Sequence, residues 1–359
     1  MNPEKSFPLI LKRKKGFANC LIILFIYLLP NISFAQKTYF KHINVEDGLS
    51  HNTVFTIFQD SKGFMWFGTK DGLNRYDGHQ FKIFKNEPDK PHSLRNNNVL
   101  FIYESREKKL WLGTNDGISI YDPSTETFTD LLVKDQNEEP IWGQILKIKE
   151  DKSGNIWVAS SSAGLYRFDP KTEMLTHYYH IADKSGSLGS GSVSSLSIDE
   201  KGVVWVGILG GSVQRFVPAN ESFTQFDSPD QTLKKDLILD IFDHGNELLI
   251  GTKNGGLKSL DKETGKLKDV LAEDQENNSL FVRNIAKYDG QEVWVCTELG
   301  VYVYNATEKK YKHLVQNPND PYSLSDNAVY SIYKDNEGGI WLGTYFGGIN
   351  YLPNSPTTF

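Results

Sequence analysis

Residues 49–77 read LSHNTVFTIFQDSKGFMWFGTKDGLNRYD, and this pattern returns along the chain at a nearly constant interval. The copies align on a tryptophan followed two residues later by a small residue. Their centres are Trp66, Trp111, Trp157, Trp205, Leu249, Trp294 and Trp341, with Leu249 in the place of a tryptophan. The successive spacings are 45, 46, 48, 44, 45 and 47 residues. Self-similarity at such a period is typical of repeat architectures.

Each copy divides into four short apolar segments separated by turn residues. In the first copy these are residues 54–58, 65–69, 73–76 and 81–84, with Asp60 and Gly63 in the first turn and Gly72 in the second. Short strands joined by such turns form antiparallel hairpins, and no copy shows a helical period. The sequence therefore predicts an all-β fold, a seven-bladed β-propeller with four antiparallel strands per blade. We expect the tryptophans to pack between blades.

The two ends of the repeat region complement each other. The seventh copy stops after its third strand, at residues 349–352, and residues 38–42 resemble a fourth strand without a blade of its own. We expect the N-terminal strand to complete the seventh blade and close the ring, which leaves no exposed sheet edge. The predicted propeller spans residues 36–359.

Residues 1–35 have the features of a secretory signal peptide. A basic cluster at residues 12–15 precedes an apolar run at 21–29 and a small-x-small site that ends at Ala35. The run is shorter than the roughly 20 residues that span a bilayer. We expect cleavage after Ala35, an exported, periplasmic protein, and no membrane span in the mature chain. Because Cys20 lies in this leader, Cys296 would remain alone, as a small buried residue.

Charge and composition exclude several classes of partner. The formal net charge is −6, and it becomes −10 without the leader, which carries five basic residues against one acidic residue. Binding to nucleic acid requires a basic surface, so we expect no nucleic-acid partner. The chain is 39% hydrophobic and 13% aromatic, with 30 glycines. These values fit a globular protein rich in short strands and tight turns.

The best copies read Leu-Ser-x-Asn-x-Val, then Asp-x-x-Gly-x-x-Trp-x-Gly-Thr, and the first continues with Asp-Gly-Leu-x-Arg-Tyr-Asp. This pattern resembles the two-component regulator propeller repeat. The seventh copy matches it at Leu324, Ser325, Asn327, Val329, Asp335, Gly338, Trp341, Gly343 and Thr344. The resemblance implies the periplasmic sensor region of hybrid two-component systems of the Bacteroidetes type, which detect carbohydrate breakdown products.

The resemblance also sets expectations for activity and partners. The sequence has one propeller and no kinase, so we expect no enzymatic activity from this chain. It would be the input region, or a truncated part, of a hybrid sensor. The implied partners are an oligosaccharide ligand and a second propeller or a kinase-bearing chain. Neither a cofactor nor a metal is expected, because His177 and His180 face opposite sides of a strand and cannot chelate an ion together.

A ligand is expected on the axial face of the propeller. We define this face by the loops that lead into the first strands and the loops that join second and third strands. Sugar binding needs flat aromatic surface and convergent hydrogen-bonding groups. Residues that meet these needs are Trp142, Tyr345 and Phe346, together with His51, Arg95, Asn97, Lys235, Arg283 and Asp326. A cluster of the basic members would favour an acidic sugar such as a uronate.

Two other functions remain open at this stage. Polysaccharide lyases and streptogramin lyases also use propellers, and a lyase needs a general base beside a cation on the axial face. His51 could serve as this base, with Arg95 as the cation. The third alternative is a protein-interaction scaffold without a small ligand. An axial histidine with a metal would favour the enzyme, and an aromatic platform without paired acid and base would favour the sensor.

Overall fold

The computed structural model describes residues 38–226, 233, 236–274, 276–290 and 292–354. The predicted signal peptide and Lys235 lie outside these residues. The propeller lies within a compact unit, Tyr39–Phe359. Among the described residues, no helix is long and apolar enough to cross a membrane.

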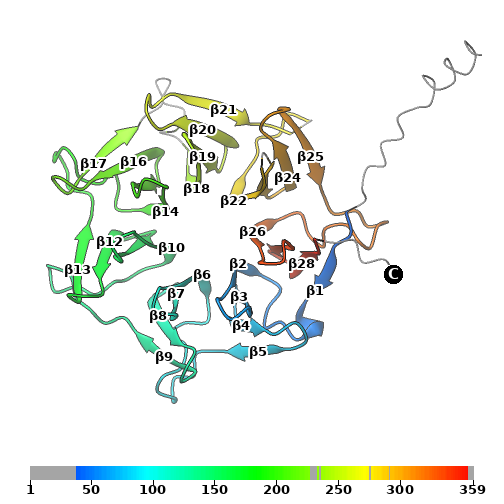
Figure 1. The fold of residues 1–359 in the computed structure, drawn as a ribbon, viewed down its shortest axis with the longest axis horizontal. Helices are drawn as coiled ribbons and strands as arrows, with labels where there is room; N and C mark the ends of the chain where they lie inside the picture. Colours follow the sequence, from blue (N-terminus) through cyan, green and yellow to red (C-terminus); the bar gives the residue numbers. More distant parts are fainter. Residues whose placement is uncertain (1–37, 227–232, 234–235, 275, 291, 355–359) are drawn as a thin grey trace, which may run out of the picture. The chain divides into compact units, whose positions relative to one another are not determined.

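Seven four-stranded antiparallel sheets are arranged around a central axis, as Figure 1 shows. This confirms the predicted seven-bladed β-propeller. We number the blades in chain order, so blade 1 contains β2 to β5 and blade 6 contains β22 to β25. Within each blade, the first strand lies nearest the axis and the fourth lies outermost.

The strand bounds follow the repeat. The first strands are β2 (Val54–Gln59), β6 (Val99–Glu104), β10 (Ile145–Glu150), β14 (Val193–Ile198), β18 (Ile238–His244), β22 (Val282–Asp289) and β26 (Val329–Lys334). The second strands are β3 (Met65–Thr69), β7 (Leu110–Thr114), β11 (Ile156–Ser160), β15 (Val204–Ile208), β19 (Glu247–Thr252), β23 (Glu292–Thr297) and β27 (Ile340–Thr344). The third strands are β4 (Gly72–Tyr76), β8 (Gly117–Asp122), β12 (Gly164–Asp169), β16 (Ser212–Val217), β20 (Leu257–Asp261), β24 (Gly300–Asn305) and β28 (Ile349–Leu352). The fourth strands are β5 (Phe81–Phe84), β9 (Thr127–Asp130), β13 (Met174–Tyr178), β17 (Ser222–Phe226), β21 (Leu267–Leu271), β25 (Lys310–Leu314) and β1 (Lys41–Ile43).

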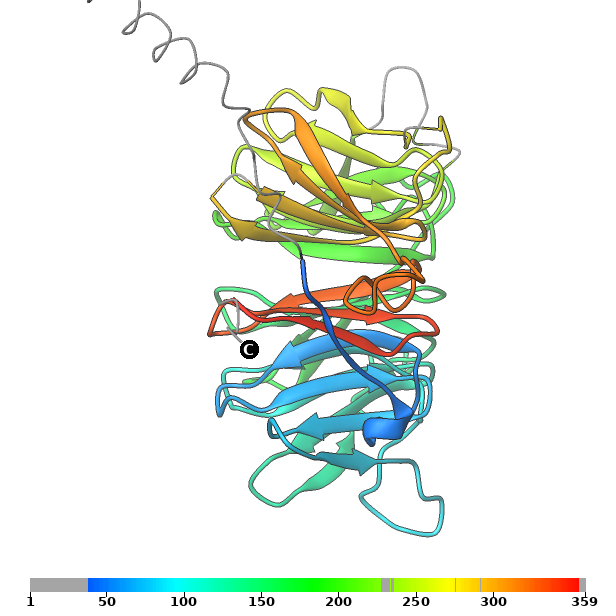
Figure 2. The same ribbon diagram turned by 90° about the vertical axis from the view of Figure 1, so that its right-hand side faces the viewer.

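The ring closes through the N-terminal strand. β1 pairs with β28, the third strand of blade 7, with Lys41 opposite Tyr351 and Ile43 opposite Ile349. Figure 2 shows β1 in blue beside the red strands of that blade. A 3-10 turn (Val45–Asp47) follows, capped by Asn44, and leads toward blade 1. The expected closure is therefore present, and β1 covers the edge that β28 would otherwise expose.

The repeated tryptophans lie in the interfaces between blades. Trp66 is 1% exposed and belongs to the same apolar cluster as Leu94, Val99 and Tyr121 of blade 2. Its Nε1 donates to Asp60 Oδ2 at 2.8 Å, and Asp60 Oδ1 accepts the backbone N–H of Phe64. The same carboxylate-to-indole bond recurs in three further blades, from Trp157, Trp205 and Trp341 to Asp151, Asp199 and Asp335. The turn aspartates therefore shape the hairpin and also pair a buried donor.

The small residue two positions after each tryptophan lies against the next blade. A Cβ placed on Gly68 would come within 2.6 Å of the backbone oxygen of Val99, so a side chain there would push two blades apart. Cys296 takes the equivalent place in blade 6, where it is 0% exposed and unpaired. Burial raises the pKa of the Cys296 thiol, so it stays neutral. Here it acts as a small apolar residue.

Candidate functional site

Each first strand carries a β-bulge near the axial face. The register shifts at the second residue of all seven strands, and a bulge of this kind redirects one side chain. The seven bulge residues are Phe55, Leu100, Leu146, Ser194, Leu239, Arg283 and Tyr330. Because these strands lie nearest the axis in Figure 1, the seven bulges lie around the axis, and the rings of Phe55 and Tyr330 contact each other with centroids 6.1 Å apart.

Aromatic and basic side chains stack at the bulges of blades 6 and 7. The Cζ atom of Arg283 lies 3.9 Å from the ring centroid of Phe281 and 4.2 Å from that of Tyr330. Arg283 Nη2 also donates to the Tyr330 hydroxyl at 3.0 Å. Tyr345 follows, with its ring centroid 5.1 Å from Tyr330, and then Phe346 at 4.6 Å from Tyr345. We call these five residues the aromatic stack.

The aromatic stack is partly open to solvent. Phe346 is 72% exposed, whereas Phe281, Arg283, Tyr330 and Tyr345 are half-buried. Burial raises the pKa of Tyr330 despite the opposing effect of the Arg283 charge, so its hydroxyl stays protonated at neutral pH. Arg283 Nε donates to Glu298 Oε1 at 2.7 Å, which balances the charge of the guanidinium. The surface therefore offers aromatic rings and hydrogen-bonding groups with little net charge.

Asp326 positions the loop that carries Tyr345 and Phe346. Its Oδ2 accepts the backbone N–H of Phe346 at 2.8 Å, and its Oδ1 accepts that of Ala328. The carbonyl oxygen of Tyr345 accepts the hydroxyl of Thr53 in blade 1 at 2.6 Å. The loop is thus fixed to two blades, and the aromatic rings are held in place before any ligand binds.

An ion pair lies one residue further along the first strands. Lys147 Nζ of blade 3 lies 2.8 Å from Asp240 Oδ1 of blade 5. Asp240 Oδ2 also accepts the side-chain amide of Asn284 at 2.7 Å and the backbone N–H of Ile285 at 2.9 Å. Lys147 Nζ lies 5.4 Å from the ring centroid of Phe101 in blade 2. These four side chains join blades 2, 3, 5 and 6 next to the axis.

Three other predicted site residues make contacts within the fold. His51 Nδ1 accepts the backbone N–H of Thr53 at 2.9 Å, within its own loop. Asn97 Oδ1 accepts the backbone N–H of Asn86 at 2.6 Å. Arg95 Nη1 lies 3.0 Å from Asp130 Oδ2. These partners fix the loops that lead into blades 1 and 2. Thr53, the partner of His51, also bonds to the backbone of Tyr345 in the aromatic stack.

Trp142 stands alone among the predicted aromatic residues. It is 46% exposed in the loop that leads into blade 3, and no ring contact joins it to the aromatic stack in the described residues. Lys235 lies outside the described residues. The structure therefore brings together Arg283, Tyr345 and Phe346, and Asp326 holds the backbone of Phe346.

The two residue pairs considered from the sequence for a lyase or a metal site do not come together in the described part of the chain. His51 and Arg95, the pair proposed for a lyase, bond to different partners and not to each other. His177 Nδ1 bonds to Asp135 Oδ2, whereas His180 Nδ1 bonds to the carbonyl oxygen of Leu188. Within the described ranges, no group of three His, Cys, Asp or Glu residues could hold a metal ion.

Sequence reasoning missed Phe281, Tyr330 and the Lys147–Asp240 pair. Tyr330 follows the first residue of its strand, where ordinary alternation gives no reason to expect a side chain in the aromatic stack. A signal was present, because the residue at this position differs among the copies while the residue before it is valine or isoleucine in all seven. The ion pair joins positions 93 residues apart, and nothing in the spacing indicates which blades face each other.

Comparison with known proteins identifies the repeat. The family described as two component regulator propeller matches residues 48–71, 93–116 and 323–346. This confirms the resemblance found in the sequence for the copies in blades 1, 2 and 7. A 74-residue stretch, 20% of the chain, is 42% identical to Histidine kinase P4 of Formosa agariphila, and covers 5% of that protein.

Solved structures extend the similarity to the whole propeller. The extracellular domains of two putative hybrid two component systems from B. thetaiotaomicron are 23% identical, with TM-scores of 0.77 and 0.74. Each alignment covers 89% of this chain, but 42% and 40% of those domains. Virginiamycin B lyase from Staphylococcus aureus has a TM-score of 0.67 at 12% identity over 89% of this chain and all of the lyase. Such identities establish the fold alone.

Proposed function

We propose that this chain is the ligand-sensing propeller of an exported two-component sensor, and that it binds a neutral oligosaccharide. The repeat type and the likeness to extracellular domains of hybrid systems support the sensor role. The observation that carries the ligand proposal is the aromatic stack on the axial face. It combines exposed rings with fixed donors and acceptors, which is what recognition of a sugar requires.

The charge of the aromatic stack favours a neutral sugar over an acidic one. Arg283 is already paired with Glu298, and Arg95 with Asp130, so neither offers a free cation to a carboxylate. The two arginines also belong to different blades, 6 and 2. A uronate would therefore meet two arginines whose charges are balanced, and Lys253, 5.8 Å from the ring centroid of Phe281, is a further cation beside the aromatic stack among the described residues.

The sensor role requires partners beyond this chain. The chain spans less than half of the extracellular domains it resembles, so a second propeller or a kinase-bearing chain would complete the signalling unit. The protein would act in the periplasm, where polysaccharide fragments arrive. Ligand occupancy of the axial face would then alter contacts with that second component.

A thermal-shift screen tests this function. The purified protein is mixed with neutral cello-, xylo-, malto- and galacto-oligosaccharides and with acidic oligogalacturonides, and each mixture is then analysed for new products. Ligand at 100 times its Kd stabilises by about 2.7 kcal/mol, which gives a clear rise in Tm. We expect a rise with one neutral series and intact sugar. Cleavage of the sugar would contradict the sensor role and favour a lyase.

A further inference from the structure

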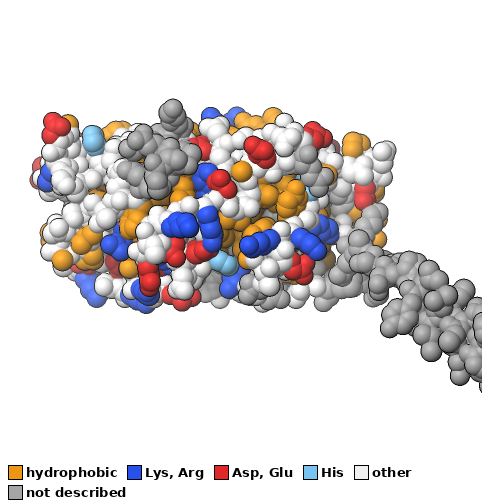
Figure 3. All heavy atoms as spheres, turned by 90° about the horizontal axis from the view of Figure 1, so that it is seen from above, with side chains coloured by type: hydrophobic (Ala, Val, Ile, Leu, Met, Phe, Trp, Pro, Cys, Tyr) orange, Lys and Arg blue, Asp and Glu red, His pale blue; other side chains and the backbone are white. Residues whose placement is uncertain are grey.

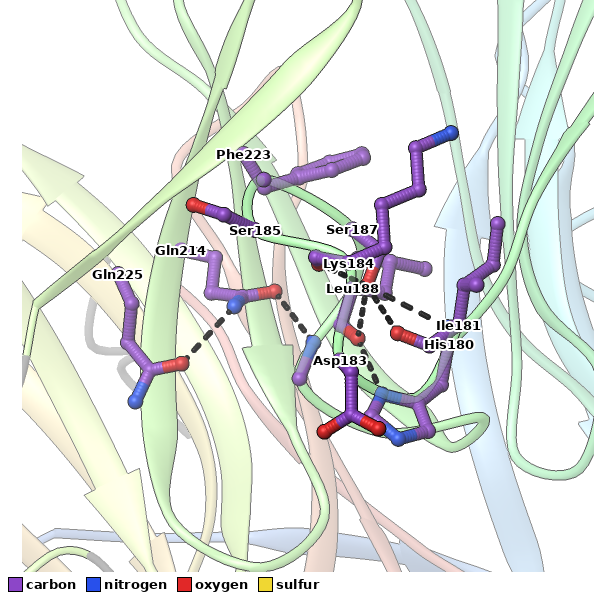
Figure 4. Close-up of a pocket in the computed structure, with 12 residues that line it drawn as sticks. His180, Ile181, Asp183, Lys184, Ser185, Ser187, Leu188, Gln214, Phe223 and Gln225 are labelled. Atoms are coloured by element: carbon purple, nitrogen blue, oxygen red, sulfur yellow. Dashed lines mark hydrogen bonds between the residues drawn. The ribbon is translucent and has the colours of Figure 1, made fainter.

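A pocket in blade 4 lies away from the aromatic stack. The loop between β13 and β14 lies against the third and fourth strands of this blade, and together they line an open hollow of about 500 Å³. This volume is within the range of about 300–1,000 Å³ that small-molecule sites occupy. Figure 4 shows the side chains of Gln214 and Gln225 facing the loop that carries His180, Asp183 and Lys184.

The floor of the pocket contains two carboxamides. Gln214, from β16, is 2% exposed. Its Oε1 accepts the backbone N–H of Gly189 at 3.1 Å, and its Nε2 donates to Gln225 Oε1 at 3.1 Å. An amide nitrogen has two hydrogens, so Gln214 Nε2 can donate once more toward the pocket. Phe223 and Leu188 add apolar wall, and both are buried.

Blade 4 differs from the other blades in the residue that follows the buried leucine or isoleucine ahead of the first strand. In blades 1 and 7 this residue is a serine that covers the third strand. In blade 1, the backbone N–H of Ser50 bonds to Asn74 Oδ1 at 2.9 Å, and Asn74 Nδ2 donates to Ser50 Oγ at 2.8 Å. Ser325 and Asn350 repeat both bonds in blade 7.

Other blades have larger side chains at this position. In blade 2 the position after the leucine holds Arg95, which bonds to Asp130, and in blade 3 it holds Trp142. In blade 6 it holds Phe281. Blade 4 has Gly189 instead, which contributes no side chain, and the longer Gln214 reaches Gln225. The pocket of blade 4 lies at this glycine.

We propose that the blade 4 pocket is a second binding site, for a neutral polyhydroxylated molecule the size of a pyranose. The Gln214 carboxamide has one N–H beyond its bond to Gln225 and a second lone pair on its oxygen, which match sugar hydroxyls that both donate and accept. The charged side chains of the pocket are one acidic residue, Asp183, and one basic residue, Lys184, so the rim has no net charge. The ligand should therefore be neutral as well. This proposal does not depend on the function proposed for the aromatic stack.

The test uses the whole protein and simple sugars. Methyl glucoside, methyl galactoside and N-acetylglucosamine are titrated into ¹⁵N-labelled protein, with glucuronic acid as the charged comparison. We expect one neutral sugar to shift the side-chain amide resonances of Gln214 and Gln225 with a Kd in the millimolar range. Gly189→Ser supplies the side chain found in blades 1 and 7, and should weaken this binding at least tenfold.

Controls separate this site from the aromatic stack and from loss of folding. A Cβ on Gly189 would meet only the flexible ends of Gln214 and Gln225, at 3.1 and 3.2 Å, so Gly189→Ser should keep its Tm. Gln225→Leu, at an exposed position, removes the polar partner without filling the hole. Phe346→Ala should leave binding in blade 4 unchanged. If no neutral sugar shifts these amides, or if Gly189→Ser binds as the parent does, the proposal is wrong.

Discussion

Lys147 and Asp240 join two blades that are not neighbours, with their charged atoms 2.8 Å apart beside the propeller axis. Their side chains are 17% and 6% exposed, so the pair is largely removed from water. Removing one member of such a pair leaves the other charge without its partner, at a cost of about 3–5 kcal/mol when burial is complete. The pair therefore stabilises the folded propeller only while both charged residues are present.

The two members of this pair should respond differently to substitution. Asp240→Ala removes the acceptor of Lys147, Asn284 and the Ile285 N–H at once, so we expect a loss of about 3 kcal/mol in unfolding free energy. Lys147→Met leaves Asp240 with its two other donors, and we expect a loss of about 1 kcal/mol. Urea denaturation measures both. Equal losses would show that the extra bonds to Asp240 contribute nothing.

The indole hydrogen bond can be measured by comparing two blades. Trp66 Nε1 donates to Asp60, whereas Trp294 Nε1 in blade 6 is buried and has no hydrogen-bond partner among the described residues. Trp66→Phe and Trp294→Phe remove similar apolar surface, but only the first breaks a bond to a charged group. We expect Trp66→Phe to cost about 1.5–3 kcal/mol more. Similar losses for the two variants in urea denaturation would argue against a role for this bond in stability.

Closure of the ring should depend on the buried side chain of Ile43 in β1. Ile43 is 4% exposed and packs in the cluster between blades 7 and 1, whereas Val45, two residues later, is 47% exposed. We expect Ile43→Ala to cost about 2–5 kcal/mol and Val45→Ala to cost little. Thermal unfolding of the two variants provides the comparison. A Tm unchanged by Ile43→Ala would mean that β1 does not hold the ring closed.

Acid should weaken the hairpins that contain the turn aspartates. Burial raises the pKa of Asp199, but hydrogen bonds from Trp205 Nε1 and the Val203 N–H, with the charge of Lys262, outweigh it, and the pKa lies below its ordinary value. The folded protein then binds fewer protons at this group than the unfolded chain does. Its contribution to stability is present above the unfolded pKa of about 3.9 and is lost as pH falls through the lower folded pKa.

Asp199→Asn should remove this part of the acid sensitivity. We expect its unfolding free energy to fall less steeply than that of the parent between about pH 5 and pH 2. Glu200→Gln, at an exposed neighbouring position, provides the control and should retain the parent slope. Urea denaturation at a series of pH values measures the slopes. Parallel curves for Asp199→Asn and the parent would contradict the depressed pKa.

The fold could be predicted almost completely, because the same four-strand unit recurs and each copy repeats the evidence of the others. The site could be predicted only in part. Tyr345 and Phe346 were found because they lie on a loop whose face follows from the topology. Tyr330 was missed because a bulge, which redirects its side chain, is not visible in the alternation of the strand. The carboxylates that neutralise Arg95 and Arg283 come from loops and strands whose proximity the spacing does not give.

The pairing of surface charges could not be predicted from the sequence either. Figure 3 shows basic and acidic side chains beside one another on one side of the molecule. One such pair in blade 5 is Lys268 with Glu247, at 2.5 Å. The sequence gives a net charge of −6 without indicating where its charges meet. Individual basic residues are therefore poor guides to an anionic ligand until their partners are known.

The most direct test of the central proposal compares two exposed aromatic residues on the axial face. Phe346 belongs to the aromatic stack and Trp142 does not, although both were predicted from their loops. The neutral oligosaccharide that raises Tm most is titrated by calorimetry into the parent, Phe346→Ala and Trp142→Ala. We predict at least a tenfold loss of affinity, about 1.4 kcal/mol, for Phe346→Ala and none for Trp142→Ala. Unchanged affinity in Phe346→Ala, or a loss confined to Trp142→Ala, would contradict binding at the aromatic stack.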